Sequence, residues 1–244
     1  MKGLRRWILR IGAVACAAGC AWGASASAPA TGDAADRPQA RAACDAGARL
    51  APRHRFGTRG RAPLAIGDSV MLGAAEEIAA VGYEVDTRGC RFMSEALAIL
   101  RARERAGSLP RFVVLALGTN GALARGEVEA ALRVVGPRRL LGLVTPRETG
   151  GGSGSDATLL RAIARERPRR TLLLDWVAYA ARRHDLTYGD GIHLTGAGQQ
   201  AMAALLRQGL WRAYPLRARA RLGAVRPGRA SPRRGEWVPA RMGP

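Results

Sequence analysis

The stretch "AIGDSVMLGAAEEI", residues 65–78, decides the fold, because it joins a short apolar run to a helical pattern through one polar turn. The run at 63–67 is short and aliphatic, as expected of a buried strand, and a helix is predicted over 70–81. Ser69 lies at the junction, directly after Asp68. Ser69 has two interpretations. It is a nucleophile, because ligands of open α/β sheets bind where strands end, or it caps the helix that follows.

The same alternation of short aliphatic runs and longer helical patterns continues along the chain. Strands are predicted at 63–67, 83–87, 112–118, 140–146 and 171–176. Helices are predicted at 70–81, 94–106, 127–135, 156–167, 177–184 and 197–211. Alternation of this kind predicts a parallel sheet that is covered by helices on both faces.

The chain of 244 residues is long enough for one sizeable α/β domain with flanking segments. A positive segment, "MKGLRRWILR", precedes an apolar one, "IGAVACAAGCAWGA", and the pair predicts a signal peptide and therefore export. Three alternatives stay open: an uncleaved signal anchor, a twin-arginine signal in place of a Sec signal, and a lipoprotein at Cys20. The predicted segments are a signal peptide at 1–28, a low-complexity linker at 29–61 that becomes ordered near Cys44, the α/β domain at 62–214, and a basic disordered tail at 215–244.

The formal net charge of +20 is unevenly distributed. The first ten residues carry four positive charges and the segment from residue 215 carries a net +7, which leaves about +9 for everything between. The chain has no zinc-finger spacing, RNP aromatics or clear recognition helix, so nucleic-acid binding is not favoured. The expected partner of the tail is an anionic cell-wall polymer or membrane surface, and the alternative is a solvated tail with no partner.

The four cysteines divide between the signal peptide and the mature chain. Cys16 and Cys20 leave with the signal, so Cys44 and Cys90 are the pair that remains in an oxidising compartment. One disulfide is the most economical outcome for such a pair, and two free thiols are the alternative. The sequence has no CxxC motif, and no metal or cofactor is expected.

Polar side chains that could take part in catalysis follow three of the predicted strands. They are Ser69, Asn120 in "GTNG", and Asp190 with His193 in "DGIH". A serine nucleophile needs a base that a third group orients. One glycine-bearing turn can present Asp190 and His193 together, so His193 is the predicted base. His54 and His184 are interpreted as surface residues.

A serine nucleophile also needs donors for the oxyanion that forms during acyl transfer. The predicted donors are the backbone N–H of Ser69, a backbone N–H near Gly89 and Cys90, and the side-chain amide of Asn120. Each signal has a plain alternative when it stands alone: a helix cap at Ser69, a turn residue at Asn120, and a local backbone acceptor at Asp190.

Four blocks, "GDSVM", "VDTRGCRF", "LGTNG" and "DGIHLTGAG", resemble the successive blocks of the SGNH (GDSL) hydrolase superfamily. They are most similar to the extracellular domain of peptidoglycan O-acetyltransferases and to related acyltransferases, and the resemblance covers residues 64–210. It implies a flavodoxin-like three-layer α/β/α sandwich with a five-stranded parallel sheet. The implied nucleophile is Ser69, the base His193 and its orienting acid Asp190. The implied oxyanion hole combines Ser69, Asn120 and the backbone around Cys90.

Two positions depart from the family pattern. Gly121 stands where the third block usually has an aspartate, and Cys90 stands where this branch often has a glycine. A disulfide from Cys44 to Cys90 would therefore clamp the loop that holds an oxyanion donor.

The leading functional hypothesis is a secreted serine esterase or acyltransferase that acts on short acyl esters, such as acetyl, of a cell-envelope glycan through an acyl-enzyme. A transferase would need a membrane partner protein that donates the acyl group, or a soluble donor. One alternative is a lipase-like or thioesterase activity on longer acyl chains. The other is a non-catalytic glycan-binding module on the same fold.

Overall fold

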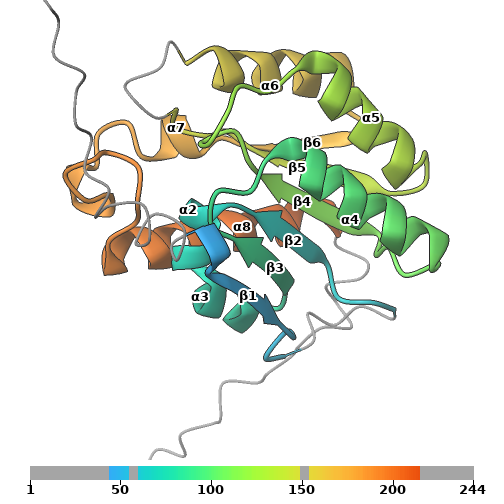
Figure 1. The fold of residues 1–244 in the computed structure, drawn as a ribbon, viewed down its shortest axis with the longest axis horizontal. Helices are drawn as coiled ribbons and strands as arrows, with labels where there is room; N and C mark the ends of the chain where they lie inside the picture. The colour runs from blue at the N-terminus through green and yellow to red at the C-terminus, as the bar shows by residue number, and fades with distance from the viewer. Residues whose placement is uncertain (1–43, 55–59, 149–153, 215–244) are drawn as a thin grey trace, which may run out of the picture. The chain divides into compact units, whose positions relative to one another are not determined.

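The computed structural model describes residues 44–54, 60–148 and 154–214 (Figure 1). The predicted signal peptide, most of the predicted linker and the predicted basic tail lie outside the described residues. The strands are β1 (Gly47–Leu50), β2 (Leu64–Gly67), β3 (Glu84–Arg88), β4 (Phe112–Ala116), β5 (Leu140–Val144) and β6 (Thr171–Leu174). They form one sheet in the order β1-β3-β2-β4-β5-β6, in which β2 to β6 are mutually parallel.

Helices cover both faces of this sheet (Figure 1). The helices are α2 (Ser69–Gly73), α3 (Ala75–Ala80), α4 (Met93–Arg105), α5 (Arg125–Val135), α6 (Ser155–Glu166), α7 (Trp176–Tyr179), the 3₁₀ helix η2 (His184–Leu186) and α8 (Gly196–Ala213). One hydrophobic cluster joins the sheet to α4, α5 and α6, and a second joins it to α2, α3, α7 and α8. The predicted three-layer α/β/α architecture is confirmed.

The strand β4 illustrates why the parallel sheet must be covered on both sides. All five of its residues are buried. Val113 and Leu115 belong to one hydrophobic cluster, whereas Phe112, Val114 and Ala116 belong to the other. Successive side chains of a strand point to opposite faces, so an entirely apolar strand needs an apolar partner layer on each side.

The five expected parallel strands are present as β2 to β6, and the sheet has one further strand. The additional strand, β1, lies inside the segment predicted as linker and pairs antiparallel with β3, with Gly47 opposite Arg88 and Leu50 opposite Val85. Its side chains alternate between exposed and half-buried, as in a strand at the edge of a sheet. The linker is expected to become ordered near Cys44, and in residues 47–50 pairing with β3 orders this Ala, Gly and Arg-rich sequence.

The helix predicted over 70–81 is two helices that meet at Ala74. The backbone of Ala74 has φ −109° and ψ 15°, and its N–H bonds back to Met71 and Leu72. The preceding residue is Gly73, which has low helix propensity, so the interruption has a local cause. The short helix predicted at 177–184 is likewise replaced by α7 and η2 with a turn between them.

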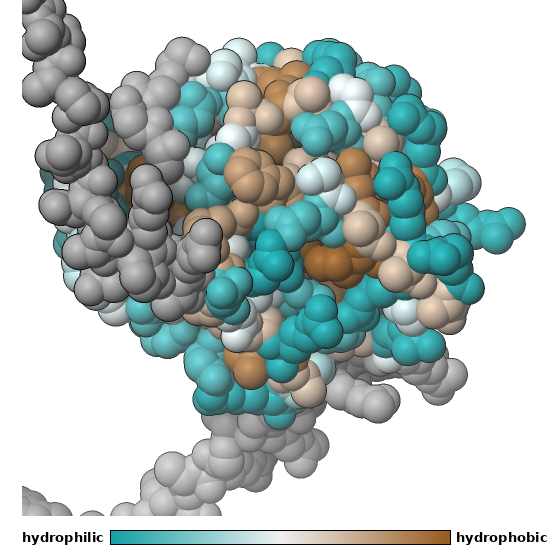
Figure 2. Space-filling view, viewed as in Figure 1, coloured by the Kyte–Doolittle hydropathy of each residue, from teal (hydrophilic) through white to brown (hydrophobic). Residues whose placement is uncertain are grey.

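The described surface is mixed in character. On the face in Figure 2, hydrophilic residues alternate with separate hydrophobic patches, an ordinary pattern for a folded domain. In the part of the chain that the structure describes, no helix combines the length and the apolar character needed to cross a membrane.

Candidate catalytic site

Ser69, His193 and Asp190 lie in one hydrogen-bonded line at the carboxyl-terminal edge of the sheet. Ser69 is the first residue of α2, directly after β2, while His193 and Asp190 come from the loop between η2 and α8. His193 Nε2 lies 3.3 Å from Ser69 Oγ, and His193 Nδ1 lies 2.6 Å from Asp190 Oδ2. These are the three side chains predicted from the sequence. They meet in the fold although Ser69 and Asp190 are 121 residues apart in the chain.

Asp190 fixes the orientation of the imidazole. Its Oδ1 accepts backbone hydrogen bonds from Ile192 (2.9 Å) and His193 (3.0 Å), which leaves Oδ2 for the ring. The hydrogen bond from His193, followed by that from Ile192, lowers the pKa of Asp190 below its usual value. An ionised carboxylate only accepts hydrogen bonds, so Nδ1 carries the proton and Nε2 presents its lone pair to the Ser69 hydroxyl.

Three N–H groups are the candidate donors for an oxyanion at the serine. Asn120 Nδ2 is buried and has no hydrogen-bond partner among the described residues. The N–H of Gly89 is already used, because it donates to the Ala46 carbonyl at 2.8 Å, which leaves the N–H of Cys90 as the candidate in this loop. The N–H of Ser69 belongs to the first residue of a helix, where no intrahelical acceptor exists. A buried donor normally has a partner, so the unpartnered Asn120 amide is suited to receiving an oxyanion.

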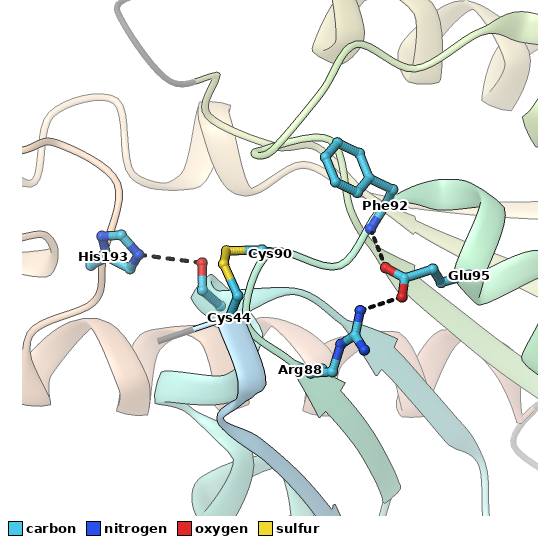
Figure 3. Close-up of a disulfide and its surroundings, with 7 residues drawn as sticks. Cys44, Arg88, Cys90, Phe92, Glu95 and His193 are labelled. Atoms are coloured by element: carbon cyan, nitrogen blue, oxygen red, sulfur yellow. Dashed lines mark hydrogen bonds and ion pairs between the residues drawn. A yellow bond between two sulfur atoms is a disulfide. The ribbon is translucent and has the colours of Figure 1, made fainter. Parts of the chain in front are cut away.

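The Cys44–Cys90 disulfide is present (Figure 3). The two Cα atoms are 4.9 Å apart and 46 residues separate the cysteines. Cys90 has φ 52° and is the only non-glycine residue with a positive φ in the described ranges. The bond therefore holds a left-handed residue in place, in the loop that follows β3.

Nothing in the sequence singles out Arg91, which anchors the same loop. Its side chain is buried, and Nη2 donates to Asp86 Oδ1 at 2.7 Å while Nη1 donates to the Gly67 carbonyl at 3.2 Å. Gly67 directly precedes the "DS" of the first block, so Arg91 connects the Cys90 loop to the segment that carries the serine. In a chain with 39 basic residues, one more arginine carries no distinguishing signal.

Phe92 explains how the chain accommodates Gly121 in place of the usual aspartate. A Cβ atom at Gly121 would lie 2.9 Å from the Phe92 ring, so the ring occupies the space of the missing side chain. The Phe92 side chain is nevertheless half-exposed, and it lies on the opposite side of Cys90 from His193 (Figure 3).

Asp68 is nearer to Ser69 in sequence than Asp190 but has a different place. It is buried, caps α2 by accepting a hydrogen bond from Val70 N at 3.0 Å, and borders a cavity of about 20 Å³. Burial raises its pKa to about 6, and hydrogen bonds from Val70 and Thr119 act in the opposite direction. His54 and His184 are exposed and take no part in the line of hydrogen bonds at Ser69.

No group of three or more His, Cys, Asp or Glu side chains among the described residues is arranged to hold a metal ion. The chemistry that this arrangement can perform is nucleophilic. A hydroxyl, a base and an orienting carboxylate are aligned, and together with oxyanion donors they are the groups that acyl transfer requires.

Comparisons with known proteins bear on the family and the fold of this chain. No family model matches the chain. It is 31% identical over 145 residues to the peptidoglycan O-acetyltransferase OatA of Listeria monocytogenes, a match that covers 59% of this chain and 23% of the relative. It is 28% identical over 149 residues to a Bacillus subtilis protein named "Putative peptidoglycan O-acetyltransferase YrhL", covering 60% of this chain and 23% of the relative. The matched part is therefore less than a quarter of the length of each relative.

The fold is similar to that of a solved catalytic domain of a peptidoglycan O-acetyltransferase. The C-terminal catalytic domain of Streptococcus pneumoniae peptidoglycan O-acetyltransferase A superposes with a TM-score of 0.57 and 22% identity, covering 62% of this chain and 93% of that domain. A protein of the G-D-S-L family from Desulfitobacterium hafniense superposes with a TM-score of 0.51 and 15% identity, covering 60% of this chain and 97% of that one. The expected resemblance to SGNH (GDSL) hydrolases and to peptidoglycan O-acetyltransferases is confirmed.

Proposed function

We propose that this chain, which has the SGNH hydrolase fold and resembles peptidoglycan O-acetyltransferases, is an exported serine esterase or acyltransferase that acts on acetyl esters of a cell-envelope glycan. The observation that carries the proposal is the line from Ser69 Oγ through His193 to Asp190, with distances of 3.3 Å and 2.6 Å. Export fits the Cys44–Cys90 disulfide, because disulfides persist in oxidising compartments.

The proposed reaction has two steps. Ser69 Oγ attacks the carbonyl carbon of the ester while its proton passes to His193 Nε2, and Asp190 stabilises the imidazolium. The oxyanion accepts hydrogen bonds from Ser69 N–H, Cys90 N–H and Asn120 Nδ2. His193 then returns the proton to the leaving alcohol, and an acyl-enzyme on Ser69 remains. Water or a sugar hydroxyl attacks that ester in the same way, which gives hydrolysis or transfer.

The proposal of a short acyl group is supported by a small cavity close to the serine in the chain. This cavity of about 20 Å³ is bordered by Asp68, Val70 and Ile192, which are sequence neighbours of Ser69 and His193, but not by Ser69 or His193 themselves. That volume corresponds to about one water molecule, which is close to the size of an acetyl methyl group. The lipase-like alternative requires room for a longer chain, and the non-catalytic alternative leaves the aligned serine and histidine without a role.

The test is an assay of the full chain on p-nitrophenyl acetate and p-nitrophenyl octanoate, with and without a glycan acceptor. We expect acetate to be the better substrate and Ser69→Ala to lower kcat by about 10³-fold or more. Ser108→Ala is the matched control, since Ser108 lies beyond α4 and bonds only to the Arg103 carbonyl. A Ser69→Ala variant that keeps most of its activity would overturn the proposal, and a preference for octanoate would favour the lipase-like reading.

A further inference from the structure

Arg147 connects the end of one strand to the loop that carries Asp190 and His193. It follows β5, separated from it by Thr145 and Pro146. Its Nη1 donates to the Gly191 carbonyl at 2.9 Å, and its Nη2 donates to the Ala180 carbonyl at 3.1 Å. Gly191 lies between Asp190 and His193 in the chain, so the guanidinium holds the loop at its centre.

The loop has internal hydrogen bonds that keep its shape. Tyr188 N donates to the His193 carbonyl at 2.9 Å, Gly191 N donates to the Tyr188 carbonyl at 2.9 Å, and Asp190 caps the turn as described above. None of these bonds fixes the distance from the loop to the sheet. Among hydrogen bonds of the described residues, only the bond from Arg147 and the His193–Ser69 contact join residues 188–193 to the ends of the parallel strands.

The strand end that carries Arg147 is itself held firmly. Thr145 is buried, and its Oγ1 donates to Asp175 Oδ1 at 3.0 Å. The Asp175 carboxylate in turn receives two hydrogen bonds from the Arg161 guanidinium, at 2.7 Å and 2.9 Å. Arg147 therefore projects from a braced position, and no carboxylate among the described residues pairs with it.

We propose that Arg147 is a positioning residue that holds the Asp190–His193 loop at the distance from which His193 can take the proton of Ser69; this rests on the proposed function. A planar guanidinium can donate to two carbonyl oxygens 11 residues apart, which a single ammonium group cannot do in the same geometry. Without it, the loop keeps its internal turn but loses its fixed place beside the serine.

The test compares Arg147→Ala with Arg170→Ala in the full chain. Arg170 is a close match, because it is also partly exposed and donates to two carbonyls, those of Leu132 (2.8 Å) and Gly136 (2.9 Å), away from Ser69. With p-nitrophenyl acetate, we expect Arg147→Ala to lower kcat by about 10- to 100-fold with little change in KM, since misplacement by about 1 Å has effects of this size. Arg170→Ala should stay within about twofold of the wild type.

A second readout separates positioning from a general structural role. Added guanidinium ion, at about 50 mM and far below unfolding concentrations, should restore part of the kcat of Arg147→Ala but none of that of Ser69→Ala. If Arg147→Ala does not fold, Arg147→Lys takes its place, and its kcat should still fall because only one of the two carbonyls is reached.

Three results would overturn the inference. They are a folded Arg147 variant with wild-type kcat, a raised KM with unchanged kcat, which would place Arg147 on the substrate, and a lost kcat that guanidinium does not restore in Arg147→Ala. Failure of the proposed function is seen separately, because Ser69→Ala would then keep its turnover whatever happens at Arg147.

Discussion

Asp68 and Asp190 are two carboxyl groups at the same edge of the sheet, and their surroundings move their pKa values in opposite directions. Hydrogen bonds from His193 and the neighbouring backbone lower the pKa of Asp190, while burial raises that of Asp68 to about 6. The exposed carboxyl is therefore ionised and orients the imidazole, whereas the buried one serves α2 as its cap. Adjacency in sequence is a poor guide to which acid assists a base, since environment assigns the roles.

Replacing Asp68 by Asn should change how the stability depends on pH. Because the pKa of about 6 in the folded protein exceeds the ordinary aspartate pKa of 3.8, Asp68 makes the free energy of unfolding fall as pH rises between these values. The fall amounts to about 3 kcal/mol from this carboxyl alone. Asn keeps an acceptor for the cap but has no proton to lose, so the difference between the two proteins should change by that amount between pH 3.5 and pH 7.

Urea unfolding at the two pH values measures this difference. Parallel pH profiles for the wild type and Asp68→Asn would contradict the assignment of a raised pKa to Asp68. Asp185→Asn is the control, because Asp185 is an exposed acid of η2.

Replacing Asp190 by Asn should remove activity while leaving the fold intact. An amide NH₂ would donate to Nδ1, so the ring proton would move to Nε2, which could then no longer accept the Ser69 proton. We expect kcat on p-nitrophenyl acetate to fall by about 10³- to 10⁴-fold, with Asp185→Asn again unchanged. An active Asp190→Asn variant would show that another group orients His193.

At the scale of elements, the loop between β3 and α4 is held from three directions. The disulfide ties Cys90 to Cys44, the Gly89 N–H extends the pairing with the β1 side, and Arg91 holds the loop to Asp86 and Gly67. Each restraint acts on the short segment that presents the Cys90 N–H. Preorganised donors cost no rearrangement during the reaction, so a loosened loop should slow turnover.

Cys44→Ser should therefore lower kcat beyond what its loss of stability explains. The free energy of unfolding should fall by about 2 to 4 kcal/mol. We expect kcat to fall about tenfold, because the Cys90 N–H is no longer held in a fixed orientation. Leu50→Ala is the control, because Leu50 is a partly buried residue of β1 whose truncation weakens the same edge without breaking the disulfide. Equal kcat for the folded Cys44→Ser variant and Leu50→Ala would limit the disulfide to a stabilising role.

At the scale of the whole molecule, the sequence predicts what depends on repeated pattern and misses what depends on single contacts. Buried aliphatic strands such as β4 are predicted directly from their runs of apolar residues. The carboxyl ends of parallel strands lie at one edge of the sheet, which is why Ser69, Asn120 and Asp190 are predicted to lie close together. The edge strand β1 has no such pattern, because its order comes from pairing with β3.

Contacts between a side chain and a backbone carbonyl leave no trace in the sequence at all. Arg147 and Arg91 are two of 38 arginines in the sequence, and only the path of the chain places a carbonyl in front of each guanidinium. Likewise, whether Gly89 or Cys90 offers the free N–H depends on the direction of the backbone after β3.

The amino-terminal and carboxyl-terminal ends of the strands have different roles, the first in stability and the second in the candidate site. Tyr83 lies at the amino-terminal edge of β3, is fully buried, and donates to the Leu206 carbonyl of α8 at 2.9 Å, across 123 residues of sequence. Tyr83→Phe removes this one buried hydrogen bond, so the free energy of unfolding should fall by about 1 kcal/mol. Because Ser69 and its partners lie at the opposite edge, kcat should stay within about twofold of the wild type.

Chemical denaturation and the p-nitrophenyl acetate assay test both halves of this prediction on one variant. Tyr179→Phe provides the comparison, since the Tyr179 hydroxyl is partly exposed and meets Arg183 only at 3.5 Å, so its loss should change stability less. A large loss of kcat in folded Tyr83→Phe would mean that the packing of α8 controls the loop in front of it. That loop contains His193 and leads directly into the first turn of α8, so the site would then depend on the amino-terminal edge as well.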